Sequence, residues 1–187
     1  QVDDGRKIVV ATPGAEPAAP GGYAAALLLD AAMGSGSTVL GVNIAAMRRW
    51  INAAVLVRAS DDGGRVMLLG HPPVATSQAF VRWDPAGLAE RELAERLELA
   101  LPPAVRAAAV TGEPAALRAF RRDLRLPATA EVLGPVPVSP EEHRLILRTP
   151  RADGSALSAA LHAAAALRSA HRDTAPVRIQ VDALDVS

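Results

Sequence analysis

The chain has 187 residues, half of them hydrophobic, and its 20 basic residues balance its 20 acidic residues. A net charge of zero argues against the strongly basic footprint of an isolated, non-specific DNA-binding domain. The absence of cysteine excludes disulfides, thiolate metal sites and a cysteine nucleophile. No apolar run reaches the roughly 20 residues that cross a bilayer and no signal-peptide pattern is found, so we expect a cytoplasmic protein.

The first part of the chain alternates short apolar runs with turns, which is typical of an α/β fold. Residues 7–12 (KIVVAT) end at a Pro-Gly turn, and residues 24–30 (AAALLLD) lie between glycines, so both are predicted as buried strands that form a parallel pair. Residues 39–57 carry apolar side chains at helical spacing and predict a largely buried helix. Residues 66–69 (VMLL) are predicted as a third strand.

A connecting helix, followed by a proline pair that ends it, is predicted over residues 86–103. Its apolar side holds Leu88, Leu93 and Leu97, and its other side is rich in Glu and Arg. We therefore expect three parts: residues 1–85, the connector over 86–103, and a C-terminal domain over 104–187.

The C-terminal part predicts the order β-α-β-β-α-β, known as the split βαβ arrangement. The strands are expected at residues 105–110, 130–133, 145–147 and 177–182, and the helices at 114–124 and 155–170. Gly134-Pro135-Val136-Pro137 separates the two middle strands. Because proline donates no hydrogen bond to a ladder and fixes φ, we expect the earlier strand to leave the sheet at this point.

The sharpest candidate for a nucleic-acid contact is LRAFRRDLR, residues 117–125. Its arginines recur at i, i+3, i+4 and i+7, which places Arg118, Arg121, Arg122 and Arg125 on one helical face. A guanidinium group pairs well with phosphate. The alternative is a solvated helix face that has no ligand.

A second basic group, Arg144, Arg148 and Arg151, follows the Gly-Pro stretch. Arg144 and Arg148 are four apart on a predicted strand and so share one face, which suggests a pocket for an acidic peptide tail of a partner. In the alternative interpretation Arg144 pairs with a neighbouring glutamate. The four histidines have no spacing that predicts a zinc site.

Three ordered segments resemble the C-terminal region of the primosomal protein N′ (PriA) family of replication-restart helicases: ERELAERLELALPPAVR (90–106), EVLGPVPV (131–138) and VRIQVDALDV (177–186). Upstream, VVATPGAEPAAPGGYAAALLLD (9–30) resembles the actinobacterial branch, in the stretch where the second RecA-like helicase lobe carries its fifth motif. The resemblance implies a partial RecA-like lobe with parallel strands over residues 1–85, followed by the α/β domain.

The resemblance also implies partners. Family members act on forked or branched DNA, interact with the single-stranded-DNA-binding protein and with other primosome components, and load the replicative helicase. The missing N-terminal half of its own protein is a further expected partner.

ATP and Mg²⁺ are implied for the full-length family, but this chain has neither a phosphate-cradling glycine loop with its Lys nor zinc-binding cysteines. The place of the arginine-rich sixth motif reads NAAVLVRAS, where only Arg58 is retained. Together with Thr12, Glu16 and Asp30, Arg58 is interpreted as a remnant of the helicase lobe. We therefore expect no cofactor in this chain and no ATPase activity of its own.

Two functions follow as hypotheses. In the first, the chain is a module that binds branched DNA and replication partners. In the second, it is a degenerate helicase-lobe scaffold that packs against the ATPase lobe and docks proteins. A stand-alone small-molecule enzyme is poorly supported, because the sequence assembles no nucleophile, base and orienting acid.

Overall fold

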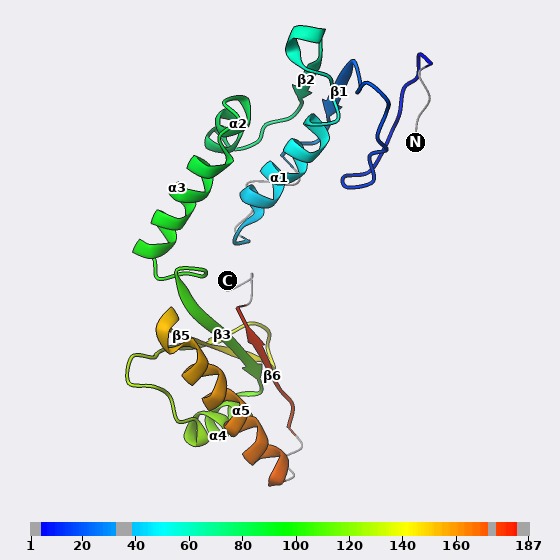
Figure 1. The fold of residues 1–187 in the computed structure, drawn as a ribbon. Coiled ribbons are helices and arrows are strands. Elements are labelled where there is room, and N and C mark those ends of the chain that lie inside the picture. Colours follow the sequence, from blue (N-terminus) through cyan, green and yellow to red (C-terminus); the bar gives the residue numbers. More distant parts are fainter. Residues whose placement is uncertain (1–4, 33–38, 172–174, 183–187) are drawn as a thin grey trace. The chain divides into compact units, whose positions relative to one another are not determined.

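A computed structural model describes residues 5–32, 39–171 and 175–182, and it divides the chain into two compact units. We call Gln1–Arg91 unit 1 and Glu92–Ser187 unit 2. The division lies inside a helix, within the stretch expected to connect two domains. Figure 1 shows the elements of each unit, which are described separately below.

Unit 1 is built around a βαβ crossover. Its elements are β1 (Ala25–Leu28), α1 (Val42–Ala54), the 3₁₀ turn η1 (Ser60–Asp62), β2 (Arg65–Leu68), α2 (Val74–Val81) and the first half of α3 (Pro85–Glu98). β1 and β2 pair in parallel, in register from Ala25 with Arg65 to Leu28 with Leu68. Parallel strands need a long crossover, and α1 supplies it.

The predicted pairing of residues 7–12 with residues 24–30 is therefore wrong. Residues 7–12 form no strand, and the parallel partner of β1 is β2. The connection between the two predicted strands was too short for a crossover helix, whereas the connection from β1 to β2 contains α1. The βαβ unit is common to many α/β folds, so a RecA-like lobe stays a prediction.

The core of unit 1 lies between the helices and one face of the strand pair. Trp50 of α1 meets Phe80 of α2 edge to face, with ring centroids 5.7 Å apart. The sequence analysis did not predict α2, because its short apolar run shows little helical periodicity. On α3, only Leu88 of the predicted apolar side is buried, whereas Leu93 and Leu97 are exposed.

Unit 2 has the predicted β-α-β-β-α-β order. Its elements are β3 (Val105–Gly112), α4 (Pro114–Asp123), β4 (Glu131–Pro137), β5 (His143–Pro150), the turn η2 (Arg151–Asp153), α5 (Gly154–Ala170) and β6 (Val177–Val181). The strands form one sheet in the order β4-β5-β3-β6, and all neighbours are antiparallel.

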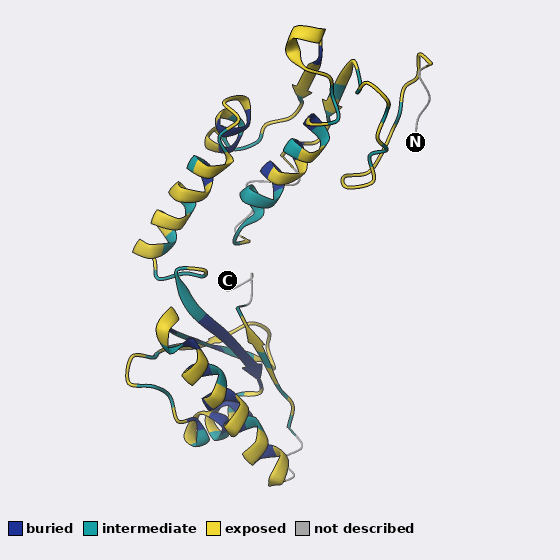
Figure 2. Cartoon of the chain, viewed as in Figure 1, coloured by how far each residue is buried: buried dark blue, intermediate teal, exposed yellow. Residues whose placement is uncertain are grey.

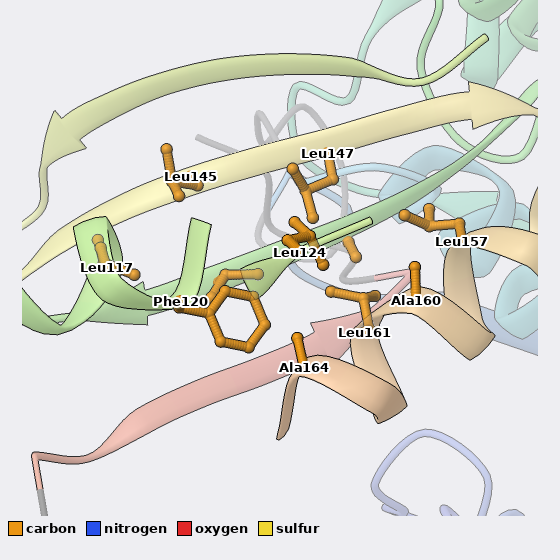
Figure 3. Close-up of a cluster of buried hydrophobic side chains, with 11 residues drawn as sticks. Leu117, Phe120, Leu124, Leu145, Leu147, Leu157, Ala160, Leu161 and Ala164 are labelled. Carbon is orange, nitrogen blue, oxygen red and sulfur yellow. The ribbon is translucent and has the colours of Figure 1, made fainter. Parts of the chain in front are cut away.

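Both helices of this domain pack on one face of the sheet. Figure 3 shows Leu145 and Leu147 of β5 pointing toward Phe120 of α4 and Leu161 of α5, and all four side chains are buried. The alternate residues of the strands lie on the opposite face, which neither α4 nor α5 covers. We call this the open face of the sheet.

The sequence analysis predicted that β4 leaves the sheet at the Gly-Pro stretch, and this prediction is wrong. β4 continues to Pro137 and shifts its register between Leu133 and Val136, so the stretch is a β-bulge. β4 is an edge strand, and a proline there need not remove a ladder hydrogen bond. Gly134 has φ of +93°, and a Cβ at this position would lie 2.8 Å from the carbonyl oxygen of Arg144.

Candidate nucleic-acid interface

Helix α4 presents a basic surface because its apolar residues are used by the core. Pro114 stands in its first turn, and Ala116, Leu117 and Phe120 face the sheet. The opposite side carries Arg118, Arg121 and Arg122, and all three residues are exposed.

Arg125 lies close to this surface but not on the helix. The helix ends at Asp123, and Leu124 is extended, with φ of −78° and ψ of 120°. The guanidinium of Arg125 turns back and donates a hydrogen bond to the carbonyl oxygen of Arg122 at 3.1 Å. The four arginines therefore form a surface made of one helical face and the turn beyond it, which we call the α4 arginine surface.

The charges of the α4 arginine surface are weakly compensated. Nε of Arg122 lies 3.9 Å from a carboxylate oxygen of Asp123, and the Arg122 side chain is 78% exposed. Such a surface contact contributes little. Cations in the last turn also stabilise the helix dipole, so Arg121 and Arg122 have a structural use as well. The surface nevertheless offers guanidinium groups to an anionic polymer.

The second predicted group is held within unit 2. Nε of Arg148 donates to Oε2 of Glu131 at 2.6 Å, and its Nη1 approaches the carbonyl oxygens of Leu99 and Ala100 at 3.3 and 3.4 Å. Nη1 of Arg151 donates to the carbonyl oxygen of Pro103 at 2.7 Å. Both arginines therefore fix the segment before β3 to the sheet.

The contact with Arg148 also changes the acidity of its partner. The hydrogen bond from the Arg148 guanidinium holds the pKa of the Glu131 carboxyl below its ordinary value. The Glu131 side chain is 54% exposed, so the pair lies at the surface. It attaches the edge strand β4 to β5.

Arg144 shares the open face with Arg148, and the register places it opposite Thr111 of β3. On the other side of Thr111 lies Arg178 of β6, which is exposed. The sequence analysis did not select Arg178, although the alternation in VRIQVD already marked it as the polar side of a half-buried strand. Arg144 and Arg178 thus flank one central position of the open face.

The four residues interpreted as a helicase-lobe remnant are not assembled into one site. Thr12, Asp30 and Arg58 are exposed, and the carboxylate of Glu16 accepts a hydrogen bond from the backbone N–H of Gly14 at 2.8 Å. Within the described residues, no hydrogen bond or ion pair joins any two of the four.

A hollow of about 290 Å³ lies in unit 2 beside the end of α5 and the start of β6. Arg168 lines it and is 93% buried, and its guanidinium reaches the carbonyl oxygens of Ala116 and Ala175 at 3.5 and 2.7 Å. Arg168 was not selected from the sequence. Its position between α4 and β6 indicates a structural role.

Over residues 5–32, 39–171 and 175–182, no group of three acidic or histidine side chains is placed to hold a metal ion. In the same parts of the chain, no helix combines the length and the apolar character needed to span a bilayer.

Comparison with known proteins gives a family for this chain. Residues 97–184 match the family model described as the primosomal protein N C-terminal domain. The chain is 44% identical to a protein of Mycobacterium leprae (strain TN) over 96% of its own length, and 41% identical, over its whole length, to proteins of Mycobacterium tuberculosis (strain ATCC 25618 / H37Rv) and Mycobacterium bovis. Each of these relatives is named as a probable replication restart protein PriA. The chain spans only 29–31% of their length.

Proposed function

Because the chain belongs to the primosomal protein N′ (PriA) family, whose C-terminal portion it spans, we propose that it is the part of a replication-restart protein that binds branched DNA and replication partners. It does not hydrolyse ATP by itself. The α4 arginine surface carries this proposal, since three exposed guanidinium groups lie on one helical face and a fourth lies directly beyond it. Phosphate contacts of this kind position a protein on DNA without reading its sequence.

The electrostatic setting explains why binding should be modest and sensitive to salt. The chain as a whole is neutral, so attraction to DNA depends on the local surface and not on net charge. Each phosphate that an arginine neutralises releases counterions and contributes about −0.9 to the slope of log K against log salt concentration.

Partner docking is a further part of this proposal. Single-stranded-DNA-binding protein and other primosome components are the expected partners. Arg148 and Arg151 bind carbonyl oxygens of their own domain, and Arg144 lies on the open face of the sheet, opposite Thr111 of β3.

A scaffold function is the second candidate, and a specific observation favours it. Unit 1 exposes large apolar side chains on its strands, which is typical of a surface that packs against another protein part. In this alternative, unit 1 docks and no part of the chain contacts DNA.

The two functions are separated by titrating the chain against a fluorescent three-way fork, a plain duplex and a single strand at two salt concentrations, with anisotropy as the readout. Preference for the fork, with affinity that falls as salt rises, supports the proposal. Absence of binding to all three at both salt concentrations would contradict it and favour the scaffold.

A further inference from the structure

Strand β6 forms one edge of the sheet of unit 2, and among the described residues it pairs only with β3. The sheet order β4-β5-β3-β6 places β4 at the other edge. An edge strand presents a row of backbone N–H and C=O groups with which another chain can pair. The two edges of this sheet differ in whether they allow such pairing.

Strand β4 has features that oppose the addition of a further strand. Its register shifts between Leu133 and Val136, and Pro135 and Pro137 have no N–H to donate. In contrast, β6 contains no glycine and no proline, and its register with β3 is regular throughout. Three of its five residues are valine or isoleucine, which favour strands. β6 is therefore the edge of this sheet that can accept another strand.

The hydrogen bonds beside β6 show which of its backbone groups point outward. Asp182, directly after the strand, donates its N–H to the carbonyl oxygen of Ala107 of β3 at 2.7 Å. Antiparallel partners alternate between pairs that exchange backbone hydrogen bonds and pairs that do not. Gln180 and Arg178 therefore bond to β3. The backbone groups of the other three residues point away from the sheet: Val177, Ile179 and Val181.

This edge is complementary to itself. When two copies of β6 pair antiparallel about a two-fold axis at Ile179, their outward backbone groups meet, and Val177 lies opposite Val181. On the open face, Arg178 then lies opposite Gln180 of the second copy, so no charge directly faces a like charge. A shift by one residue would place Arg178 opposite Arg178, but the backbone groups of Arg178 are already bonded to β3.

The charge after the strand favours the same register. The Asp182 carboxylate lies 2.6 Å from the guanidinium of Arg106, and the Asp182 side chain is still 39% exposed. In the register centred on Ile179, Asp182 is diagonal to Arg178 of the second copy, a spacing that a long side chain can reach. Arg178 is exposed. Each copy therefore offers an opposite charge to Arg178 of the other.

We infer that β6 pairs with β6 of a second copy of this chain, antiparallel and centred on Ile179, so that the two sheets become one. The two-fold axis stands perpendicular to the sheet, which places α4 and α5 of both copies, and with them both α4 arginine surfaces, on the same side. The strand is short, so the association should be weak and should appear at high concentration. The pairing uses no residue of α4 and is independent of DNA binding.

Disulfide trapping tests the register, because the chain contains no cysteine of its own. Chains with Arg178→Cys and chains with Gln180→Cys are mixed under mild oxidation, and the mixed disulfide is measured by intact mass. Opposite residues in a pair without hydrogen bonds have Cα atoms about 4.5 Å apart, which a disulfide can span.

The matched control mixes Arg178→Cys with Val136→Cys, because Val136 is exposed and lies on the other edge strand. We expect roughly tenfold more mixed disulfide from the pair at positions 178 and 180 than from the control, since only the former holds the two sulfur atoms in bonding geometry. Equal yields from the two mixtures would overturn the inference.

A proline substitution gives a second measurement. The N–H of Val181 points outward, so Val181→Pro removes a hydrogen bond between the copies and none to β3. We expect the dissociation constant of the dimer to rise about tenfold or more for Val181→Pro, and less than about threefold for Val181→Ala, which keeps the N–H. Sedimentation velocity at increasing concentration measures both. A chain that stays monomeric at every concentration, or equal weakening by the two variants, would contradict the pairing.

Discussion

The two units differ in what becomes of their apolar strand residues. In unit 2 the central strand β3 is buried along most of its length, and the helix face of the sheet is closed by α4 and α5 (Figure 2). In unit 1 both strands have one packed face, and Leu27 and Met67 on the other face are half exposed. Unit 2 therefore has the properties of an independent domain, whereas unit 1 has those of part of a larger one.

Removal of the Phe120 ring from the core of unit 2 should have the largest effect on stability. It should also show whether the two units unfold separately. Phe120 of α4 is fully buried against α5 and the sheet, so Phe120→Ala is expected to lower the free energy of unfolding of unit 2 by about 3–5 kcal/mol. Far-UV circular dichroism during denaturation measures this loss.

Tryptophan fluorescence provides the matching control, because both tryptophans of the chain, Trp50 and Trp83, lie in unit 1. Phe120→Ala should leave the fluorescence transition unchanged. An equal shift of both transitions would show that the units unfold as one body, and the comparison between them would fail.

The bulge in β4 should be sensitive to a single methyl group. Gly134→Ala places a Cβ near the Arg144 carbonyl oxygen at a positive φ, and is expected to destabilise unit 2 by about 1–3 kcal/mol. Gly63→Ala is the control: Gly63 has φ of +81° but no atom near its Cβ position, so it should cost only the roughly 1 kcal/mol of holding a residue with a Cβ in the left-handed region. Equal losses in urea denaturation would mean that the close contact in the bulge has no energetic weight.

We expect Arg148 to contribute more to the stability of unit 2 than to the binding of partners. Arg148→Met keeps the aliphatic stem but removes the hydrogen bonds to Glu131 and to the carbonyl oxygens of Leu99 and Ala100, and is expected to lower the stability of unit 2 by about 1–2 kcal/mol. Thermal denaturation measures this. Unchanged stability together with weaker binding of an acidic peptide would restore Arg148 as a partner contact.

The smallest expected effect depends on pH. The folded state lowers the pKa of Glu131, so the carboxylate form stabilises unit 2 above the unfolded pKa, and this contribution is lost as pH falls through the lowered folded pKa. The advantage of the wild type over Glu131→Gln should therefore be constant near neutral pH and shrink in acid, when melting is followed from neutral to about pH 3. A difference that does not change with pH would contradict the assigned pKa shift.

The sequence predicted unit 2 more closely than unit 1, and the reason is physical. The segments of unit 2 have their partners within the chain, so local patterns such as the alternation in VRIQVD became strands. Residues 7–12 have an equally clear pattern but form no strand. The sequence could not reveal this, because pairing is a property of the tertiary structure.

The candidate site was predictable in part. The helical spacing of Arg118, Arg121 and Arg122 predicted that these side chains are exposed, because the same helix buries Phe120 on its other side. The internal hydrogen bonds of Arg148 and Arg151 could not be read from spacing, since their acceptors are backbone carbonyl groups 48 or 49 residues away. The backward turn of Arg125 depended on where α4 ends, and helix ends are the least predictable feature of an element.

The salt dependence of fork binding tests the central claim most directly. Arg121→Ala with Arg122→Ala should reduce the magnitude of the slope of log K against log salt by about 1.8, from two phosphate contacts at about 0.9 each. Arg48→Ala with Arg49→Ala is the matched control, because these two arginines are also adjacent, exposed and helical, but lie on α1 of unit 1. A reduced slope for the α4 pair alone is the predicted result. An unchanged slope for the α4 pair, or an equal change for both pairs, would contradict DNA binding through the α4 arginine surface.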